Sequence, residues 1–300
     1  MQRFNQLLVL ICLAFCETVH ASGIFIDALH WRVTETNDWV YLNSLTTPIQ
    51  TLDYRGIEFN YNTGVRVGGV VEKNGNDFLM AYTHYDASAN DSAVGHLQPS
   101  FIGSVTAKPS HAYLYSAGQV YQKISYNVVD FDLGHSFHPT QIITFHPYLG
   151  IMASRINQNI QAQYQGSTSS NENLINNFKG IGPKLGIDAD IQLYDYNNVQ
   201  PILFASFATS YLAGNWNIRD TTTTVPVQNI NVISSNPRMG AVTLQSSIGF
   251  KLDYKKLQLK LAYEMNDWRD QCQFFDNDTG AHNNDLVLQG LTLGVNYSFG

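Results

Sequence analysis

Charge is scarce in this sequence of 300 residues, because only 14% of them are Asp, Glu, Lys or Arg, against ~25% in an ordinary soluble domain. The balance is acidic, with a formal net charge of −7, and leaves no surplus of Lys and Arg for the basic patch of a nucleic-acid-binding protein. After the first 20 residues the chain has no run of ~18 consecutive apolar residues, which excludes a transmembrane helix.

Cysteine is nearly absent, with three residues in the whole chain, two of them near the N-terminus. That N-terminal segment has the features of a secretory signal peptide: a positive charge at Arg3, a short apolar run, and small residues at Val19 and Ala21 before a cleavage site. We therefore predict a signal peptide at residues 1–21 and a mature chain of residues 22–300. One cysteine then remains, so an internal disulfide is excluded.

Aromatic residues and glycine are plentiful, with 17 Tyr, 16 Phe and 22 Gly, and this composition suits a large β structure. Hydrophobic and polar residues alternate with period two, which predicts strands with one apolar face. The alternation is clearest in segments 57–71, 181–193, 242–254, 257–265 and 287–299. Noisier strands are predicted near 24–34, 77–87, 119–135, 141–160 and 200–216, with a β-bulge at 126–131 where the apolar positions shift by one residue.

The connections between these strands alternate in length. The long ones are 35–54, 88–118, 163–177, 217–238 and 270–284, and the short ones are 73–76, 136–140, 195–199 and 255–256. This rhythm predicts an all-β fold, a transmembrane antiparallel β-barrel of about ten strands with long outer loops and short periplasmic turns. A soluble β-sandwich or β-solenoid is the alternative, but its outward face would carry more charge.

Aromatic residues gather at both ends of the predicted strands. Trp31, Trp216 and Trp268 fall where strands meet outer loops, and Tyr254, Tyr297 and Phe299 are among those at the inner ends. This arrangement predicts two aromatic girdles at the membrane interfaces. The same topology places Cys272 in an outer loop, where an odd thiol is a candidate for an intermolecular disulfide; a reduced or capped thiol is the alternative.

Several segments carry a family resemblance. The end of the chain, Thr292-x-Gly294-x-x-Tyr297-x-Phe299, matches a pattern found at the end of bacterial outer-membrane proteins, although Gly300 follows the last aromatic residue. The segments 178–188, 128–134, 146–150 and 288–295, in their order, resemble the Legionella major outer membrane protein family. The resemblance implies an outer-membrane barrel with a pore-forming role, and it supplies neither a substrate nor catalytic residues.

Motifs for catalysis and cofactor binding are missing, so we predict no enzyme, no cofactor and no metal site. His135, His138 and His146 cluster around a predicted turn, and three His can bind a metal, but a polar turn that is rich in His by chance is the preferred explanation. Some ten-stranded barrels are proteases with Asp and His at the outer rim. The corresponding residues here, Asp86, Asp91, Asp270 and His282, form no recognisable pair in the sequence.

Charged residues on the polar faces of the strands are expected to line the barrel interior: Glu58, Arg66, Lys184, Asp188, Asp190, Lys251, Asp253, Lys260 and Glu264. They either pair and plug the lumen or line a narrow aqueous path. The leading prediction is a porin-like protein for passive diffusion of small solutes, and the alternative is an adhesin or structural surface protein with a plugged barrel. The expected partners are outer-membrane lipid and lipopolysaccharide, small solutes or ions, a homo-oligomer and host-cell surfaces, but no nucleic acid.

Overall fold

The computed structural model describes residues 21–35, 37–46, 49–73, 75–100, 115–195, 199–225, 229–276 and 280–299. Within these ranges no helix is long and apolar enough to cross a membrane. The predicted signal peptide lies outside the described residues except for Ala21, where the first strand begins.

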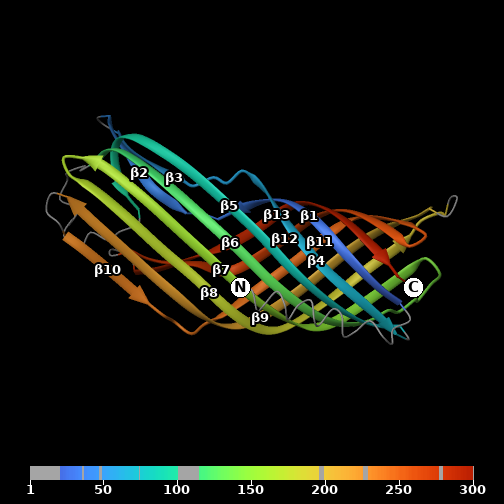
Figure 1. Ribbon diagram of the computed structural model, residues 1–300. Coiled ribbons are helices and arrows are strands. Elements are labelled where there is room, and N and C mark those ends of the chain that lie inside the picture. The colour runs from blue at the N-terminus through green and yellow to red at the C-terminus, as the bar shows by residue number, and fades with distance from the viewer. Residues whose placement is uncertain are drawn as a thin grey trace.

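Ten antiparallel strands close into a barrel (Figure 1). In barrel order they are β1 (Ala21–Thr34), β4 (Tyr61–Lys73), β5 (Asn76–Pro99), β6 (Tyr115–His135), β7 (Ile143–Gly166), β8 (Ser169–Gln192), β9 (Val199–Val225), β11 (Gly240–Tyr254), β12 (Leu257–Asp276) and β13 (Gly280–Ser298). Pairing of β13 with β1 closes the ring. The predicted fold class and strand number are confirmed.

Three further strands extend one end of the barrel. The hairpin of β2 (Asp38–Thr46) and β3 (Ile49–Gly56) follows β1 and pairs with the far end of β5, and β10 (Asn229–Ser235) pairs with the far end of β9. The hairpin lies at the end of the barrel opposite the C-terminus in Figure 1. The short turns and both ends of the described chain lie at the other, periplasmic end.

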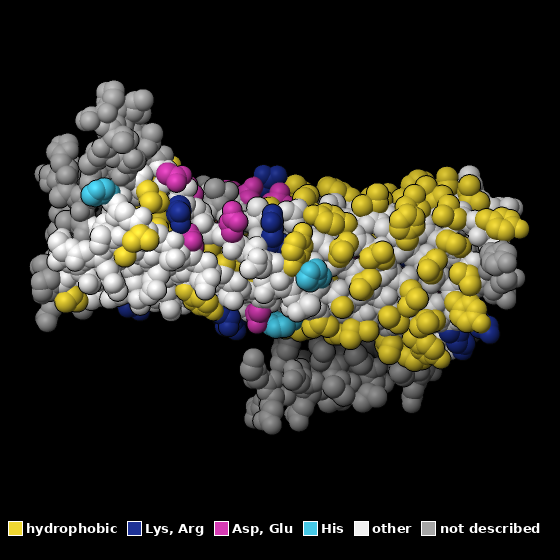
Figure 2. All heavy atoms as spheres, turned by 90° about the horizontal axis from the view of Figure 1, so that it is seen from above, with side chains coloured by type: hydrophobic (Ala, Val, Ile, Leu, Met, Phe, Trp, Pro, Cys, Tyr) yellow, Lys and Arg dark blue, Asp and Glu magenta, His cyan; other side chains and the backbone are white. Residues whose placement is uncertain are grey.

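An outward-facing apolar band surrounds the periplasmic half of the barrel. Figure 2 shows hydrophobic side chains gathered over this half, whereas the other half of the visible face is mostly polar. Exposed members of the band include Ile26, Val67, Phe78, Leu133, Leu149, Ile151, Ile181, Leu185, Phe207, Ile248, Leu261 and Leu293. Such a band is the surface that an outer-membrane barrel presents to lipid.

The strands continue well beyond this band, and most of the described residues in the predicted outer loops belong to strands. For example, the predicted loop 163–177 consists of the ends of β7 and β8, which are joined by residues 167–168 alone. Beyond the membrane, the outward face contacts water and the inward face carries many amides and hydroxyls. Hydrophobic alternation therefore fades there although the strands go on, and the sequence pattern fails to detect them.

Two details of the sequence prediction are wrong. The β6 strand keeps its register through 126–131, because Tyr126 and Val128 point into a packed interior while Phe131 points outward, and no bulge is needed. The three tryptophans that were predicted to form the outer aromatic girdle do not face the membrane interface, because Trp31, Trp216 and Trp268 are buried inside the barrel. The inner-end aromatic residues, including Tyr254 and Tyr297, are exposed as predicted.

Candidate functional site

The candidate site is the interior of the barrel, which is divided into layers along its axis. Within the membrane-spanning half lies a cavity of about 320 Å³. Its lining is charged and polar, and it reaches from Gln258 and Asn296 near the periplasmic turns to Tyr126. Because inward positions are every second residue of each strand, all ten barrel strands contribute residues to the lining of this cavity.

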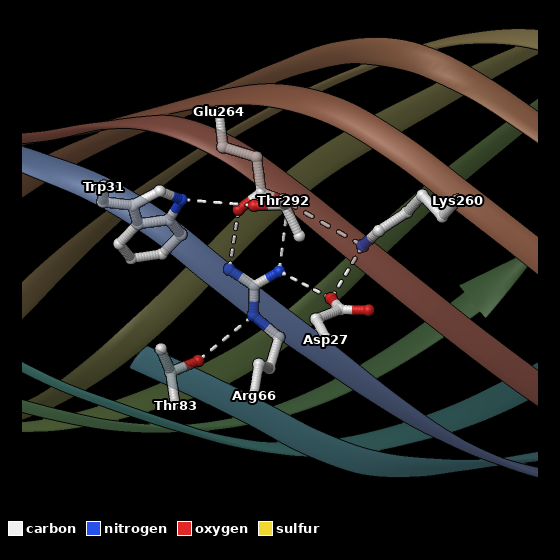
Figure 3. A network of polar contacts seen from close by, with 7 residues as sticks. All are labelled: Asp27, Trp31, Arg66, Thr83, Lys260, Glu264 and Thr292. Atoms are coloured by element: carbon white, nitrogen blue, oxygen red, sulfur yellow. Dashed lines mark hydrogen bonds and ion pairs between the residues drawn. The ribbon is translucent and has the colours of Figure 1, made fainter. Parts of the chain in front are cut away.

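Arg66 is at the centre of the first charged network in the cavity (Figure 3). Its guanidinium binds Glu264 through two hydrogen bonds of 3.1 and 2.9 Å, and it also lies 3.1 Å from Asp27. Lys260 donates to Asp27 at 2.7 Å. These four residues come from β4, β12 and β1. The network therefore links strands on both sides of the β1–β13 pairing that closes the barrel.

A second set of ion pairs continues around the cavity wall from the first, since Lys251 lies directly opposite Lys260 in the pairing of β11 and β12. Lys184 of β8 donates to Asp130 and Asp132 of β6, each at 2.9 Å. His146 lies between two carboxylates, 2.6 Å from Asp77 and 3.2 Å from Asp188. Lys251 of β11 pairs with Asp190 at 2.9 Å. The interior cations are thus neutralised by carboxylates across the strands.

An apolar layer closes the barrel beyond the cavity. We call it the aromatic layer and define it by Trp31, Tyr85, Tyr126, Met152, Phe178, Trp216 and Trp268, all of which are buried. The Trp268 ring packs edge-on against Tyr126, with ring centroids 5.7 Å apart. The strands that carry them, β12 and β6, are separated by four strands on either side, so this contact spans the diameter of the barrel.

Other rings fill the remaining width of the aromatic layer. Phe178 lies 6.5 Å from Trp268 and 4.6 Å from Trp216, measured between ring centroids. Tyr85 donates its hydroxyl to the backbone carbonyl of Trp31 at 2.7 Å. Aromatic rings at such separations pack as in a protein core. The interior at this level is therefore a packed core rather than a channel.

A polar layer lies above the aromatic layer, beyond the apolar band. Glu35 folds back into the barrel after β1 and accepts hydrogen bonds of 2.7 Å from Asn37, Gln122 and Gln158. Burial raises the pKa of Glu35 to about 6. Asn176 extends this layer by donating to Gln158 at 3.0 Å.

Cys272 also belongs to this polar layer, and its predicted exposure is wrong. It lies in β12 after an irregularity in the pairing with β13, and its side chain is fully buried. Burial and the nearby Glu35 carboxylate raise the pKa of the Cys272 thiol well above its usual range. A buried, protonated thiol is neither accessible nor reactive enough for the intermolecular disulfide considered from the sequence.

Two carboxylates lie still farther out. Glu172 of β8 and Asp220 of β9 are buried side chains on neighbouring strands, and in the described part of the chain neither has an ion-pair partner. Burial raises the pKa of Asp220 to about 6. Burial, together with Asp220 beside it, raises the pKa of Glu172 well above its usual value.

The predicted lining residues lie inside the barrel with one exception. Arg66, Lys184, Asp188, Lys251, Lys260 and Glu264 line the cavity, while Asp190 binds Lys251 and Asp253 accepts from Gln258 at 2.7 Å. The prediction for Glu58 is wrong. This residue is exposed in the connection between β3 and β4, where its neighbours Ile57 and Phe59 are buried instead.

Sequence reasoning missed several charged residues of the cavity. Asp130 and Asp132 alternate with outward Val129 and Phe131, so uninterrupted period two would have placed them inside; the supposed bulge hid this signal. Asp27, Asp77 and His146 were missed because their strands alternate less clearly.

The three His do not form a metal site. His135 contacts Asn76 at 3.0 Å, and His138 contacts Thr144 at 3.0 Å, whereas His146 points into the cavity. Within the described ranges no three His, Cys, Asp or Glu residues are grouped to hold a metal ion.

Comparison with known proteins identifies the family. The family model described as the Legionella pneumophila major outer membrane protein precursor matches residues 16–299. The chain belongs to this family. With the barrel fold, this membership places the protein in the bacterial outer membrane. None of the curated protein sequences matches the chain.

Solved structures similar to this family member are outer-membrane barrels. The outer membrane protease OmpT of Escherichia coli is 12% identical, with a TM-score of 0.52, and the match covers 94% of this chain and 98% of OmpT. The toluene transporter TodX of Pseudomonas putida is 6% identical, with a TM-score of 0.28 and coverage of 95% and 91%. At these identities the OmpT likeness shows the fold alone, and the TodX score supports no argument.

Proposed function

We propose that this protein is a sealed outer-membrane barrel that acts at the cell surface as a structural and recognition protein. The recognition surface is the polar part of the barrel wall that lies beyond the apolar band, which we call the outer cylinder. The observation that carries the proposal is the aromatic layer, in which Trp268 and Tyr126 meet across the full diameter of the barrel. A barrel of about 8 strands is just filled by side chains and ~16–18 strands leave a channel, so ten strands favour a filled interior.

The outer cylinder fits this role. Strands of 20 to 27 residues, such as β12 and β9, exceed the ~9–11 residues that cross a bilayer, so the wall projects beyond the membrane. Its interior is packed by the aromatic and polar layers, which keeps the projecting wall rigid. Rigid scaffolds that hold exposed surfaces and connections are a common basis for recognition.

A second candidate is the passage of small solutes that the sequence suggested. The observation that favours it is the charged cavity of about 320 Å³ within the membrane-spanning half. Passage would require the aromatic layer to move aside, because that layer separates the cavity from the outer end. The predicted non-enzymatic nature and the partners stay predictions under either candidate.

Liposome swelling tests the two candidates. The protein is refolded into lipid vesicles, and the vesicles are diluted into an isotonic solution of a small sugar such as arabinose. The sealed barrel predicts no swelling above that of protein-free vesicles. Swelling that grows with the amount of folded protein would overturn the proposal in favour of passive diffusion.

A further inference from the structure

One face of the outer cylinder has an unusual separation of charge. It is formed by the outward positions of β6, β7, β8 and β9 beyond the apolar band. The cations on it are Lys123, Arg155, Lys179 and Arg219, all exposed. Asn, Gln, Ser and Thr make up most of the rest, and the described outward positions of these four strands include no Asp or Glu.

The acidic residues of the same strands all point inward. They are Asp130, Asp132, Glu172, Asp188, Asp190 and Asp220. In a chain with a formal net charge of −7, this segregation leaves a cationic face on an acidic protein. The interior cations Lys184 and Lys251 have carboxylate partners, whereas among the described residues Arg155 and Lys179 have no ion pair.

Arg155 and Lys179 also lie directly opposite each other in the pairing of β7 and β8. Directly opposed side chains have Cβ atoms ~4.5–5.5 Å apart, and like charges in such pairs destabilise a sheet. The neighbouring outward pair toward the periplasm is Ala153 and Ile181, and Ile181 belongs to the apolar band. The two cations therefore lie one row above the band, at the level of the lipid headgroups, where a bound anion would relieve their repulsion.

A hollow of about 450 Å³ lies farther out on the same face. Its lining is mostly amides and hydroxyls, among them Gln161, Asn171 and Thr221, together with Arg219, and it also includes Ile175 and Glu172, whose side chain is buried. Amide and hydroxyl groups donate and accept hydrogen bonds, which suits the hydroxyls of a sugar. From the periplasmic half outward, this face therefore presents apolar, then cationic, then uncharged polar groups. A phosphorylated glycolipid carries matching groups in the same order, namely acyl chains, phosphates and sugars.

We propose that this face binds a phosphorylated glycolipid of the outer leaflet, lipopolysaccharide. Arg155 and Lys179 contact the phosphates next to the acyl chains, and Arg219 with the amides of the hollow contacts the core sugars. The site lies on the outside of the barrel, so it is independent of whether the lumen is sealed.

The test measures binding of purified lipopolysaccharide to the full-length barrel in nonionic detergent. Arg155→Gln combined with Lys179→Gln should weaken binding about tenfold or more, because each Lys or Arg near an anionic membrane surface contributes ~1 kcal/mol. The matched control is Lys255→Gln with Lys256→Gln, which removes two exposed cations at the periplasmic turn and should leave binding unchanged. Circular dichroism checks that all variants remain folded.

Two further arms assign the contacts and the source of the anion. Arg219→Gln should weaken binding of lipopolysaccharide that carries core sugars, but not of the lipid portion alone. Dephosphorylated lipopolysaccharide should bind wild type as weakly as the intact form binds the double variant, and inorganic phosphate should not compete at equal phosphate concentration. Equal binding by wild type and the double variant would overturn the proposal. So would stronger binding of heparin than of lipopolysaccharide, which would assign the face to sulfated host polysaccharides.

Discussion

At the scale of single residues, the Arg66 network shows how charge is tolerated inside the barrel. Arg66 binds Glu264 and Asp27 while it is mostly shielded from water, so Arg66→Gln leaves buried carboxylates with less compensation. We expect a loss of about 3–5 kcal/mol in the free energy of unfolding from lipid vesicles, measured with denaturant. Arg32→Gln is the control, because Arg32 is exposed and forms no ion pair with the described residues, so its removal should cost at most ~1 kcal/mol. Similar losses in both variants would contradict the packing of the interior.

On the outer face of the membrane-spanning half, side chains contact lipid, so charge is unfavourable there. Leu261 is exposed within the apolar band, whereas Gln258, on the opposite face of the same strand, lines the cavity. Leu261→Arg should destabilise the barrel in bilayers by ~2–4 kcal/mol, the cost of Arg near the membrane midplane. Gln258→Arg, next to Asp253, should cost far less. The same unfolding measurement checks both, and equal damage would mean that the facing of β12 is misassigned.

At the scale of elements, the outer segments of β8 and β9 carry a pH-dependent contribution. The pKa of Asp220 rises from 3.8 to about 6 on folding, and that of Glu172 rises as well. Between these values the unfolded chain releases protons that the folded barrel keeps, so the free energy of unfolding falls as pH rises. The contribution of these two carboxylates to stability should be complete below about pH 4 and be lost as the pH rises through 6 and above.

Glu172→Gln combined with Asp220→Asn should reduce this decline and stabilise the barrel at pH 8. A residual slope is expected, because the raised pKa of Glu35 acts in the same direction over the same range. Thermal unfolding in detergent between pH 4 and 8 measures the effect, with the exposed Asp86→Asn as control. An unchanged slope in the double variant would show that these carboxylates are not the source.

The strands also show how much of the fold could be predicted from the sequence. Period two located the strands where one face meets lipid, as in 257–265 and 287–299, because lipid demands an unbroken apolar face. Beyond the membrane that demand ends, and the extensions of β7 and β8 were taken for a loop. The interior was harder, since the rings of Trp31, Trp216 and Trp268 suit a membrane interface as well as a core, and only the closed barrel decides between them.

At the scale of the whole molecule, the barrel combines a charged cavity in its membrane-spanning half with the packed aromatic layer beyond it. In the cavity, carboxylates outnumber amino and guanidinium groups. If the seal is removed, the exposed path should therefore prefer cations, and the preference should fade at high salt as the charges are screened. Reversal potentials in a KCl gradient measure this. Anion preference at low salt would show that the Lys and Arg side chains control the path.

Single-channel recording in planar bilayers tests the seal most directly. Wild type is compared with Trp268→Ala combined with Tyr126→Ala, the two rings that meet across the barrel. Folded wild type should show no stepwise conductance, and discrete openings should appear once both rings are replaced by Ala. Steady conductance from wild type, unchanged by the two replacements, would contradict the seal.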